Sequence, residues 1–304
     1  MREFTFTVEK EDEGMGIRRL LKKRLDFSSR LLARLKAEHR VFLNGEPLQG
    51  WMTPRAGDVI TAVLPVETSH FPPEDIPIRP VFEDDDLLII DKPAGYTVHP
   101  TKGHPDHTIA NGLMKYMADT NQTFKIRFAN RLDMDTTGLL IVAKNSHAQD
   151  EIVRQMDGNI LKKYYRALVV GEPAEDRFTI DLPIGMPDPE KVGRAVMPEG
   201  QGRPSVTHVL VEERFHGFSL CRIRLETGRT HQIRVHLSHL GFPIAGDPLY
   251  GGDCPGLIGR QALHAARLEF RHPADGRPMC VSCPLPRDMA DAVNRVKTGA
   301  YSLD

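Results

Sequence analysis

The chain has 304 residues and a formal net charge of −1, and 40% of its residues are hydrophobic. This composition predicts one large domain or two smaller ones with real cores, and it argues against a disordered chain. The longest apolar runs are four or five residues, far short of the roughly 20 that a membrane-spanning helix needs. Four scattered cysteines and an N-terminus without an apolar leader favour a cytoplasmic protein with reduced thiols. We therefore expect no membrane span and, by default, a monomer.

Charge is unevenly distributed along the chain. Between residues 18 and 46, nine Lys and Arg residues stand against three Asp and Glu residues, which gives a local charge of +6. An excess this one-sided in a near-neutral protein predicts a patch that binds a polyanion. The alternative is a solvated helix face, which charge runs usually form.

The first 65 residues predict a small α+β unit. Hydrophobic residues alternate with polar ones over residues 4–8, as in a short strand. Residues 17–25 predict a basic helix, and a serine at 28 or 29 can cap a second one. An Asn-Gly pair within residues 41–48 is typical of a tight hairpin, and residues 57–64 close the unit as a strand.

At these residues the unit resembles the S-four RNA-binding domain, which occurs in a ribosomal protein and in several RNA-modifying enzymes. The resemblance rests on the paired basic helices, on residues 40–45 and on residues 57–60. It departs at residues 17–20, where Ile-Arg-Arg-Leu replaces the usual Arg-Leu-Asp opening. The cations that it implies for RNA binding are Arg18, Arg19, Lys22, Lys23, Arg30, Arg34 and Lys36.

A proline-rich segment separates this unit from the rest of the chain and predicts an extended linker over residues 66–80. We therefore expect domains at residues 1–65 and 81–304. In the second domain the predicted strands outnumber the helices and do not alternate regularly with them. This pattern predicts an α+β domain, with a central, mostly antiparallel mixed sheet flanked by helices. The predicted strands are residues 81–83, 87–90, 164–170, 206–211 and 218–225, and the predicted helices begin near Thr108 and Ser146.

A polar stretch, residues 130–138, precedes an apolar run that predicts a buried strand over residues 139–143. It carries Arg131, Asp133 and Asp135. Side chains that do chemistry are often held in loops at the ends of rigid strands. The alternative is an ordinary turn in which one of the aspartates binds its own backbone.

A second polar stretch follows the strand that ends near Leu225. Residues 227–229 predict a turn, after which Thr230 can cap a helix that stops at Gly241. Arg229 is thereby expected at a helix entrance, where its guanidinium can hold a carboxylate with two hydrogen bonds.

No sequence spacing predicts a metal site. His231, His236 and His239 are expected on a helix surface or in packing, because no acid or cysteine completes a ligand pattern around them. Cys280 and Cys283 form a lone Cys-x-x-Cys without a second pair.

Taken together, the motifs of the large domain resemble the RluA/RluD family of RNA pseudouridine synthases over about residues 81–286. An S-four domain ahead of such a domain is typical of that family. Asn130 and Thr137 stand where histidine and serine are common in it. The matching motifs are Asp91-Lys92-Pro93-x-Gly95, Arg131-Leu132-Asp133-x-x-Thr136-Thr137-Gly138, Lys163-x-Tyr165, Thr227-Gly228-Arg229-Thr230-His231-Gln232-Ile233-Arg234, Gly246-Asp247-x-x-Tyr250-Gly251 and Leu263-His264-Ala265.

The resemblance implies that the protein isomerises uridine to pseudouridine in structured RNA, with Asp133 as the catalytic residue. By analogy, Arg229 pairs with Asp133 and balances its charge, while Tyr165 and Ile233 pack against the target base. Arg131 is expected to enter the RNA stack beside the flipped-out uridine, with a phosphate contact as the alternative.

The resemblance further implies that large-subunit ribosomal RNA is the substrate, with transfer RNA as the other candidate. No metal or organic cofactor is expected, because the reaction is redox-neutral and the base is its own leaving group and nucleophile. The carboxylate either traps the sugar covalently or helps to remove a sugar proton, and the sequence leaves both routes open.

Two other functions are compatible with the residues alone. A catalytically silent RNA-binding or ribosome-assembly factor keeps the fold for binding, but retention of Asp133, Tyr165 and Arg229 together argues against it. A nucleoside or glycoside hydrolase uses one carboxylate for cleavage and water for capture. The lack of a paired acid other than Asp135 makes this the weakest of the three hypotheses.

Overall fold

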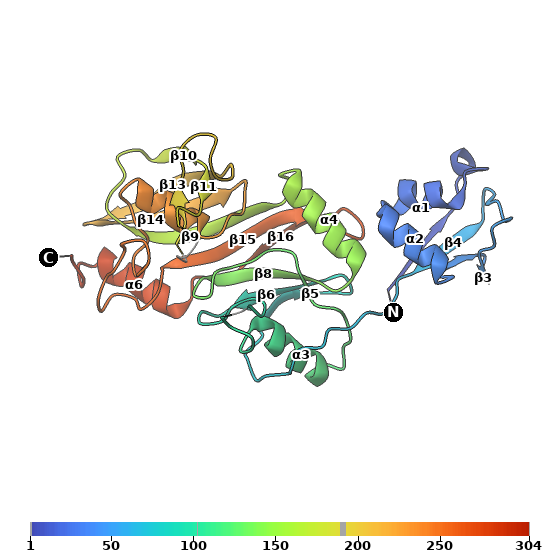
Figure 1. Cartoon of the computed structure of the whole chain (residues 1–304), viewed down its shortest axis with the longest axis horizontal. Coiled ribbons are helices and arrows are strands. Elements are labelled where there is room, and N and C mark those ends of the chain that lie inside the picture. Colours follow the sequence, from blue (N-terminus) through green and yellow to red (C-terminus); the bar gives the residue numbers. More distant parts are fainter. Residues whose placement is uncertain (1, 102, 189–192, 304) are drawn as a thin grey trace.

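Two sheets with separate hydrophobic cores organise the computed structural model, which describes residues 2–101, 103–188 and 193–303 (Figure 1). The smaller sheet is antiparallel and runs in the order β1-β4-β2-β3. Two helices cover it. The elements of this small unit are β1 (Glu3–Thr7), the short 3-10 helix η1 (Lys10–Asp12), α1 (Ile17–Leu25), α2 (Ser29–Ala37), β2 (Val41–Leu43), β3 (Glu46–Pro47) and β4 (Val59–Val63).

The local signals of the small unit work as the sequence predicts. Helix α1 has the predicted bounds, and the Ser28 hydroxyl accepts a hydrogen bond from the Leu31 amide at 3.3 Å at the start of α2. Asn44 and Gly45 adopt positive φ angles of 52° and 86° and close the predicted hairpin. Leucines on the inner faces of both helices are fully or almost fully buried, so the helices are held by packing on the sheet.

The large unit is built on a ten-stranded sheet with the path β10-β13-β14-β9-β15-β8-β6-β5, where β16 adds to β15 and β7 adds to β8. A separate two-stranded sheet pairs β11 with β12. The elements are β5 (Pro80–Glu83), β6 (Leu87–Lys92), α3 (Ile109–Asp119), β7 (Arg127–Phe128), β8 (Thr137–Ala143), α4 (Ser146–Asp157), β9 (Lys162–Val170), β10 (Arg177–Asp181), β11 (Ile184–Gly185), β12 (Ala195–Val196), β13 (Val206–Phe215), β14 (Phe218–Leu225), α5 (Gln232–His239), β15 (Leu263–Arg271), β16 (Pro278–Ser282) and α6 (Arg287–Lys297).

The predicted α+β class is confirmed. Among the described residues, the strand pairs of the large sheet are antiparallel except for β8 with β15, which is parallel. Helix α4 begins one residue away from the expected cap, because the Asn145 side chain rather than Ser146 accepts the hydrogen bond from the Ala148 amide. None of the described helices combines the length and the apolar character needed to cross a membrane.

Strand β8 lies at the centre of the large unit, and all seven of its residues are buried. Its alternate side chains enter two different cores: Leu140 and Val142 pack with residues of α3, whereas Leu139 and Ile141 pack with residues of α4. Cover on both faces explains why this segment is continuously apolar rather than alternating. The rigid strand gives the polar loop before it a fixed base.

The small unit contacts the large one at α4 (Figure 1). The rings of Phe4 and Phe27 meet the His147 ring edge-on, with centroid distances of 5.2 and 4.9 Å. The Arg2 guanidinium also donates to both carboxylate oxygens of the buried Asp86. The linker expected over residues 66–80 has no helix or strand before Pro80.

Candidate active site

A buried lysine holds the loop that carries Asp133 through hydrogen bonds to its backbone. Lys92, at the end of β6, is fully buried, and its ammonium group donates to the carbonyl oxygens of Pro93, Met134 and Thr136 at 2.8, 2.7 and 3.0 Å. Burial lowers the pKa of Lys92 to about 7, and the nearby carboxylates of Asp135 and Asp133 oppose this shift. Three carbonyl acceptors satisfy the whole donor capacity of the group, so Lys92 fixes the loop instead of facing solvent.

Two further contacts hold the other end of the loop. The Arg260 guanidinium donates to the Asp135 carbonyl at 3.1 Å and forms two hydrogen bonds with the Asp288 carboxylate. Gly138 has a φ of +107°, and a Cβ there would lie 2.3 Å from the Ala265 carbonyl oxygen on β15. A glycine is therefore required where β8 begins.

Arg234, on α5, is the ion-pair partner of Asp133. Its Nη1 lies 3.3 Å from Asp133 Oδ2, while its Nε and Nη2 donate to the two oxygens of Asp247 at 2.7 and 2.9 Å. Asp247 is fully buried, and its Oδ1 also accepts hydrogen bonds from two backbone amides. The guanidinium lies over the ring of Tyr250, 5.0 Å from its centroid. Such a bidentate clamp fixes both the position and the plane of the guanidinium that faces Asp133.

The expectation that Arg229 pairs with Asp133 is therefore wrong in this structure. Arg229 belongs to the turn before α5, and its Nε donates to the Pro204 carbonyl at 3.2 Å. Helix α5 starts at Gln232, and its N-cap is His231 instead of the predicted Thr230. The Gln232 side-chain oxygen accepts hydrogen bonds from the Arg229 amide and the Thr227 hydroxyl, which holds the preceding turn. Arg229 still lines the same groove as Asp133.

Tyr165 and Ile233 lie where they can form an apolar wall near Asp133. Tyr165 is on β9 and Ile233 is on α5, their exposed fractions are 7% and 4%, and both line the groove. Burial raises the pKa of the Tyr165 hydroxyl, and the Asp133 charge raises it further. The tyrosine is therefore a neutral hydroxyl on an apolar surface.

The groove around these residues has a volume of about 1390 Å³. Small-molecule sites usually measure about 300–1,000 Å³, so the groove suits a segment of a polymer better than a free metabolite. It extends from α5 and the Asp133 loop to helix α2 of the small unit, where Arg30 and Arg34 line it. The cations of the large unit that line it are Lys125, Arg127, Arg131, Lys163, Arg229 and Arg234.

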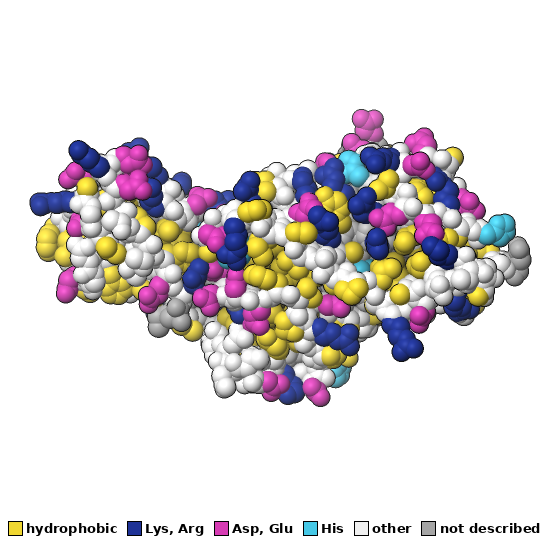
Figure 2. Space-filling view, turned by 180° about the vertical axis from the view of Figure 1, so that it is seen from behind, with side chains coloured by type: hydrophobic (Ala, Val, Ile, Leu, Met, Phe, Trp, Pro, Cys, Tyr) yellow, Lys and Arg dark blue, Asp and Glu magenta, His cyan; other side chains and the backbone are white. Residues whose placement is uncertain are grey.

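The cations predicted to bind RNA do not share one environment. Within the described residues, Arg18, Arg19, Lys22, Arg30 and Lys36 are exposed and form no ion pair. The face in Figure 2 has Lys and Arg side chains spread over both units.

Two of the predicted cations are occupied by neighbouring acids. Lys23 binds Glu11 and the buried Asp12, and Arg34 binds Glu38 and Glu67. Glu11 and Asp12 lie before residue 18, outside the basic stretch. They neutralise part of its charge, so the patch of cations carries less net positive charge than the sequence predicts.

Sequence reasoning missed the roles of Lys92, Arg234 and Asp247. All three lie in the motifs of the family resemblance, but motif membership does not say which side chains touch. Arg131, by contrast, is exposed and lines the groove, as an RNA contact requires. Two groups of possible metal ligands occur among the described residues, one around His264 and one around His272, and neither lines the groove.

The chain is similar in sequence to known proteins. Residues 86–239, just over half of the chain, match the family described as RNA pseudouridylate synthase. A protein of Xanthomonas campestris pv. campestris named ribosomal large subunit pseudouridine synthase D is 39% identical over 278 residues, which cover 87% of this chain and 83% of that protein. A protein of Bacillus subtilis named uncharacterized RNA pseudouridine synthase YlyB is 36% identical over 302 residues, with coverage of 98% and 99%.

A solved structure shares the fold. Human RNA pseudouridylate synthase domain containing 1 superposes with a TM-score of 0.57 at 29% identity, covering 71% of this chain and 86% of the human one. The fold, the groove and these matches define an enzyme that converts uridine to pseudouridine in RNA. The chain belongs to the RluA/RluD family of RNA pseudouridine synthases.

Proposed function

We propose that the protein isomerises specific uridines of large-subunit ribosomal RNA, and that Asp133 is the residue that does so. The observation that carries the proposal is the ion pair between Asp133 and a doubly anchored Arg234, in a groove too large for a nucleoside alone. The choice of RNA rests on the relatives, several of which are named ribosomal large subunit pseudouridine synthase D.

The reaction breaks the bond between C1′ of the ribose and N1 of the base, turns the base, and joins C1′ to C5. Cleavage develops positive charge on the sugar, and the Asp133 carboxylate meets it either by forming an ester at C1′ or by removing the 2′ proton. Arg234 holds one carboxylate oxygen at 3.3 Å, so the other oxygen is available to the sugar. Rejoining at C5 releases the C5 proton, and the chain's own side chains supply all the groups in this scheme.

The apolar wall explains how the detached base stays in place. Tyr165 and Ile233 cover the base while it turns, and the neutral Tyr165 hydroxyl is available for proton transfer at C5. A buried tyrosine of this kind also excludes water, which would otherwise capture the sugar and give hydrolysis.

Duplex RNA hides the target bond, so the uridine must leave the stack before it can reach Asp133. Arg131 is two residues away, is exposed and lines the groove. It occupies the gap left by the flipped base or, alternatively, contacts a neighbouring phosphate. The unit up to residue 65, of S-four type, binds the RNA backbone through its exposed cations, and one of these, Arg30 on α2, lines the groove.

Nucleoside analysis tests this function against its rivals. Transcripts of large-subunit ribosomal RNA are incubated with the full chain, digested, and separated into nucleosides and free base. We expect pseudouridine to replace uridine one for one, without free uracil. Release of uracil would instead indicate a hydrolase, and unchanged RNA that still binds the protein would indicate a silent binding factor. Transfer RNA in a parallel reaction tests the other substrate.

A further inference from the structure

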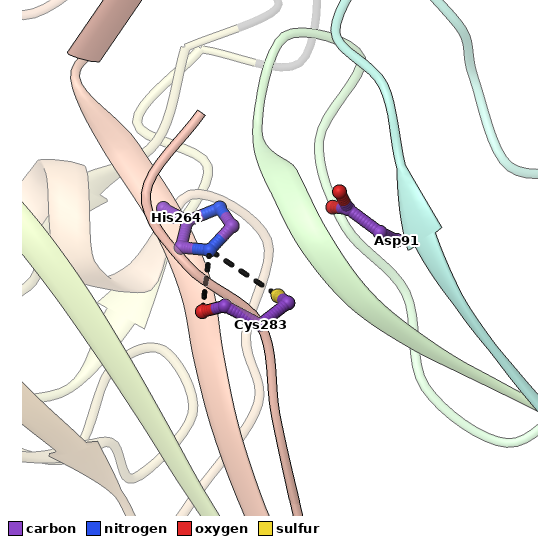
Figure 3. Close-up of side chains that lie close together, drawn as sticks. All are labelled: Asp91, His264 and Cys283. Carbon is purple, nitrogen blue, oxygen red and sulfur yellow. Dashed lines mark hydrogen bonds between the residues drawn. The ribbon is translucent and has the colours of Figure 1, made fainter. Parts of the chain in front are cut away.

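A second group of reactive side chains lies on the opposite face of β8 from the Asp133 groove. Asp91 on β6, His264 on β15 and Cys283 just after β16 approach one another there, and one possible ligand atom from each lies within 4.8 Å of the others (Figure 3). His264 is fully buried, Cys283 has an exposed fraction of 8%, and Asp91 is half-buried. A thiol, an imidazole and a carboxylate are the three side-chain types that bind zinc in proteins.

His264 is oriented as a metal ligand requires. Its Nδ1 lies 2.9 Å from the Thr137 hydroxyl, and its Nε2 faces the Cys283 sulfur at 3.3 Å. In a tetrahedral zinc site with bonds of about 2.1 Å to nitrogen and 2.3 Å to sulfur, these two atoms would be about 3.6 Å apart. A metal-binding histidine usually donates its other ring N–H to an oxygen acceptor, which fixes the tautomer and the plane of the ring, and the Thr137 hydroxyl can be that acceptor here.

Within the described residues the Asp91 carboxylate forms neither a hydrogen bond nor an ion pair. Burial raises its pKa, and the nearby charges of Arg79 and Lys92 oppose this shift. Its side chain points across β8 toward Cys283 (Figure 3). A half-buried acid without a partner is costly, and a cation between it and the thiol removes that cost.

In the second group of possible ligands among the described residues, the acids do have hydrogen-bond partners. Asp86 already binds Arg2 and Asn145, and Asp84 binds His272 and two backbone amides. Those acids are satisfied without a cation. In the cluster around His264 the acid has no hydrogen bond within the described residues, whereas the Cys283 thiol lies within hydrogen-bond distance of His264 Nε2 and of the Ala265 carbonyl.

A cavity adjoins the thiol of this cluster. A cavity of about 320 Å³ on the back of the sheet is lined by Cys283 together with Ala266 and Ser282. Of the three ligand residues, Cys283 alone lines this cavity, so an ion would approach the cluster from the thiol side.

We propose that Asp91, His264 and Cys283 bind one zinc ion. The ion links β6, β15 and the segment just after β16, on the face of β8 opposite the Asp133 groove. Binding forms bonds from zinc to sulfur, nitrogen and oxygen and releases the thiol proton to solvent, with no change of oxidation state. The ion has three protein ligands and one open position. It takes no part in the isomerisation, so the proposal stands or falls independently of the proposed function.

Cobalt titration of the full chain tests the site, because Co²⁺ reports tetrahedral geometry and thiolate ligation in its absorption spectrum. The protein is first stripped with a chelator, and circular dichroism checks that each variant stays folded. We expect wild type to bind one equivalent of Co²⁺ with a thiolate charge-transfer band, and Zn²⁺ to displace it. Cys280→Ser, an exposed cysteine three residues away, is the matched control and should behave as wild type.

Cys283→Ala should lose the charge-transfer band and at least 100-fold in zinc affinity, and Asp91→Asn should weaken zinc binding while keeping the band. Thr137→Val should reduce zinc affinity by about 10–100-fold through loss of the support for His264. Zinc should raise the melting temperature of wild type and Cys280→Ser but not that of Cys283→Ala. The proposal is overturned if wild type binds less than half an equivalent, or if the band is absent or depends on Cys280.

Discussion

The surroundings of the Asp133 loop and the helices of the small unit both contain several cations, but these cations act differently. Around the loop Lys92 and Arg234 are buried. Lys92 donates to three carbonyl oxygens, and each guanidinium nitrogen of Arg234 donates to a carboxylate oxygen. On the small unit Arg18, Arg19 and Lys22 are exposed and have no ion pair within the described residues. Buried and fully partnered cations set geometry, whereas exposed ones supply long-range attraction that does not depend on their exact position.

This difference predicts large effects from conservative changes near Asp133 and small, additive effects on the small unit. Four experiments test the contrast, in order of decreasing expected effect.

Arg234→Lys should reduce the rate of pseudouridine formation by about 10²–10³-fold, the scale for losing one preorganised electrostatic contact. Lysine keeps the charge but cannot span Asp133 and Asp247 with a rigid fork. Arg229→Lys is the matched control, since Arg229 lines the groove without touching Asp133. Single-turnover rates compare the two variants. A larger loss of rate in Arg229→Lys would support the Arg229–Asp133 pair that the sequence predicted.

Asp247→Asn should lower the turnover number by about 10–100-fold, as for other changes to a supporting partner. It does not touch the groove, so the affinity for RNA should stay unchanged while the rate falls. Equal loss of RNA binding and rate would show that the change acts through general unfolding instead of through the position of Arg234.

Gly138→Ala should lower the free energy of unfolding by about 2–5 kcal/mol, because it combines an unfavourable φ with a clash against β15. Gly95→Ala is the control: its φ is +87°, but no atom lies within 4 Å of the added Cβ, so about 1–2 kcal/mol is expected. Urea denaturation measures both. Equal losses would mean that β8 can move away from β15.

The smallest effects belong to the small unit. Arg18→Gln or Lys22→Gln should each reduce the slope of log affinity for RNA against log salt by about 1, the value for one lost phosphate contact. Lys23→Gln should change the slope less, because Asp12 and Glu11 already neutralise this cation. A Lys23 effect as large as that of Lys22 would show that the RNA displaces those acids.

The sequence predicted local features well, because their signals are local. The Asn44-Gly45 turn, the Ser28 cap and the apolar β8 segment follow from turn chemistry, capping and cover on both faces of the sheet. The central ion pair could not be predicted in this way. Arg229 and Arg234 lie in the same motif, five residues apart, and only the path of the backbone around Gln232 decides which guanidinium reaches Asp133.

The same limit applies to the cluster behind β8. Asp91, His264 and Cys283 are far apart in sequence and follow no ligand spacing, so only the order of strands in the sheet brings them together. Lys23 illustrates the opposite error. Its charge contributes to the local excess, but its acidic partner Asp12 lies in η1, before the basic stretch.

Tritium release from RNA labelled at C5 of uridine tests the central claim most directly, because the label leaves only when C1′ joins C5. The full chain is compared with Asp133→Asn and with Asp135→Asn, which changes the neighbouring acid in the same loop. We predict that Asp133→Asn binds the RNA and releases no tritium, while Asp135→Asn releases it at a rate within about tenfold of wild type. Release by Asp133→Asn at the wild-type rate would contradict the role assigned to Asp133.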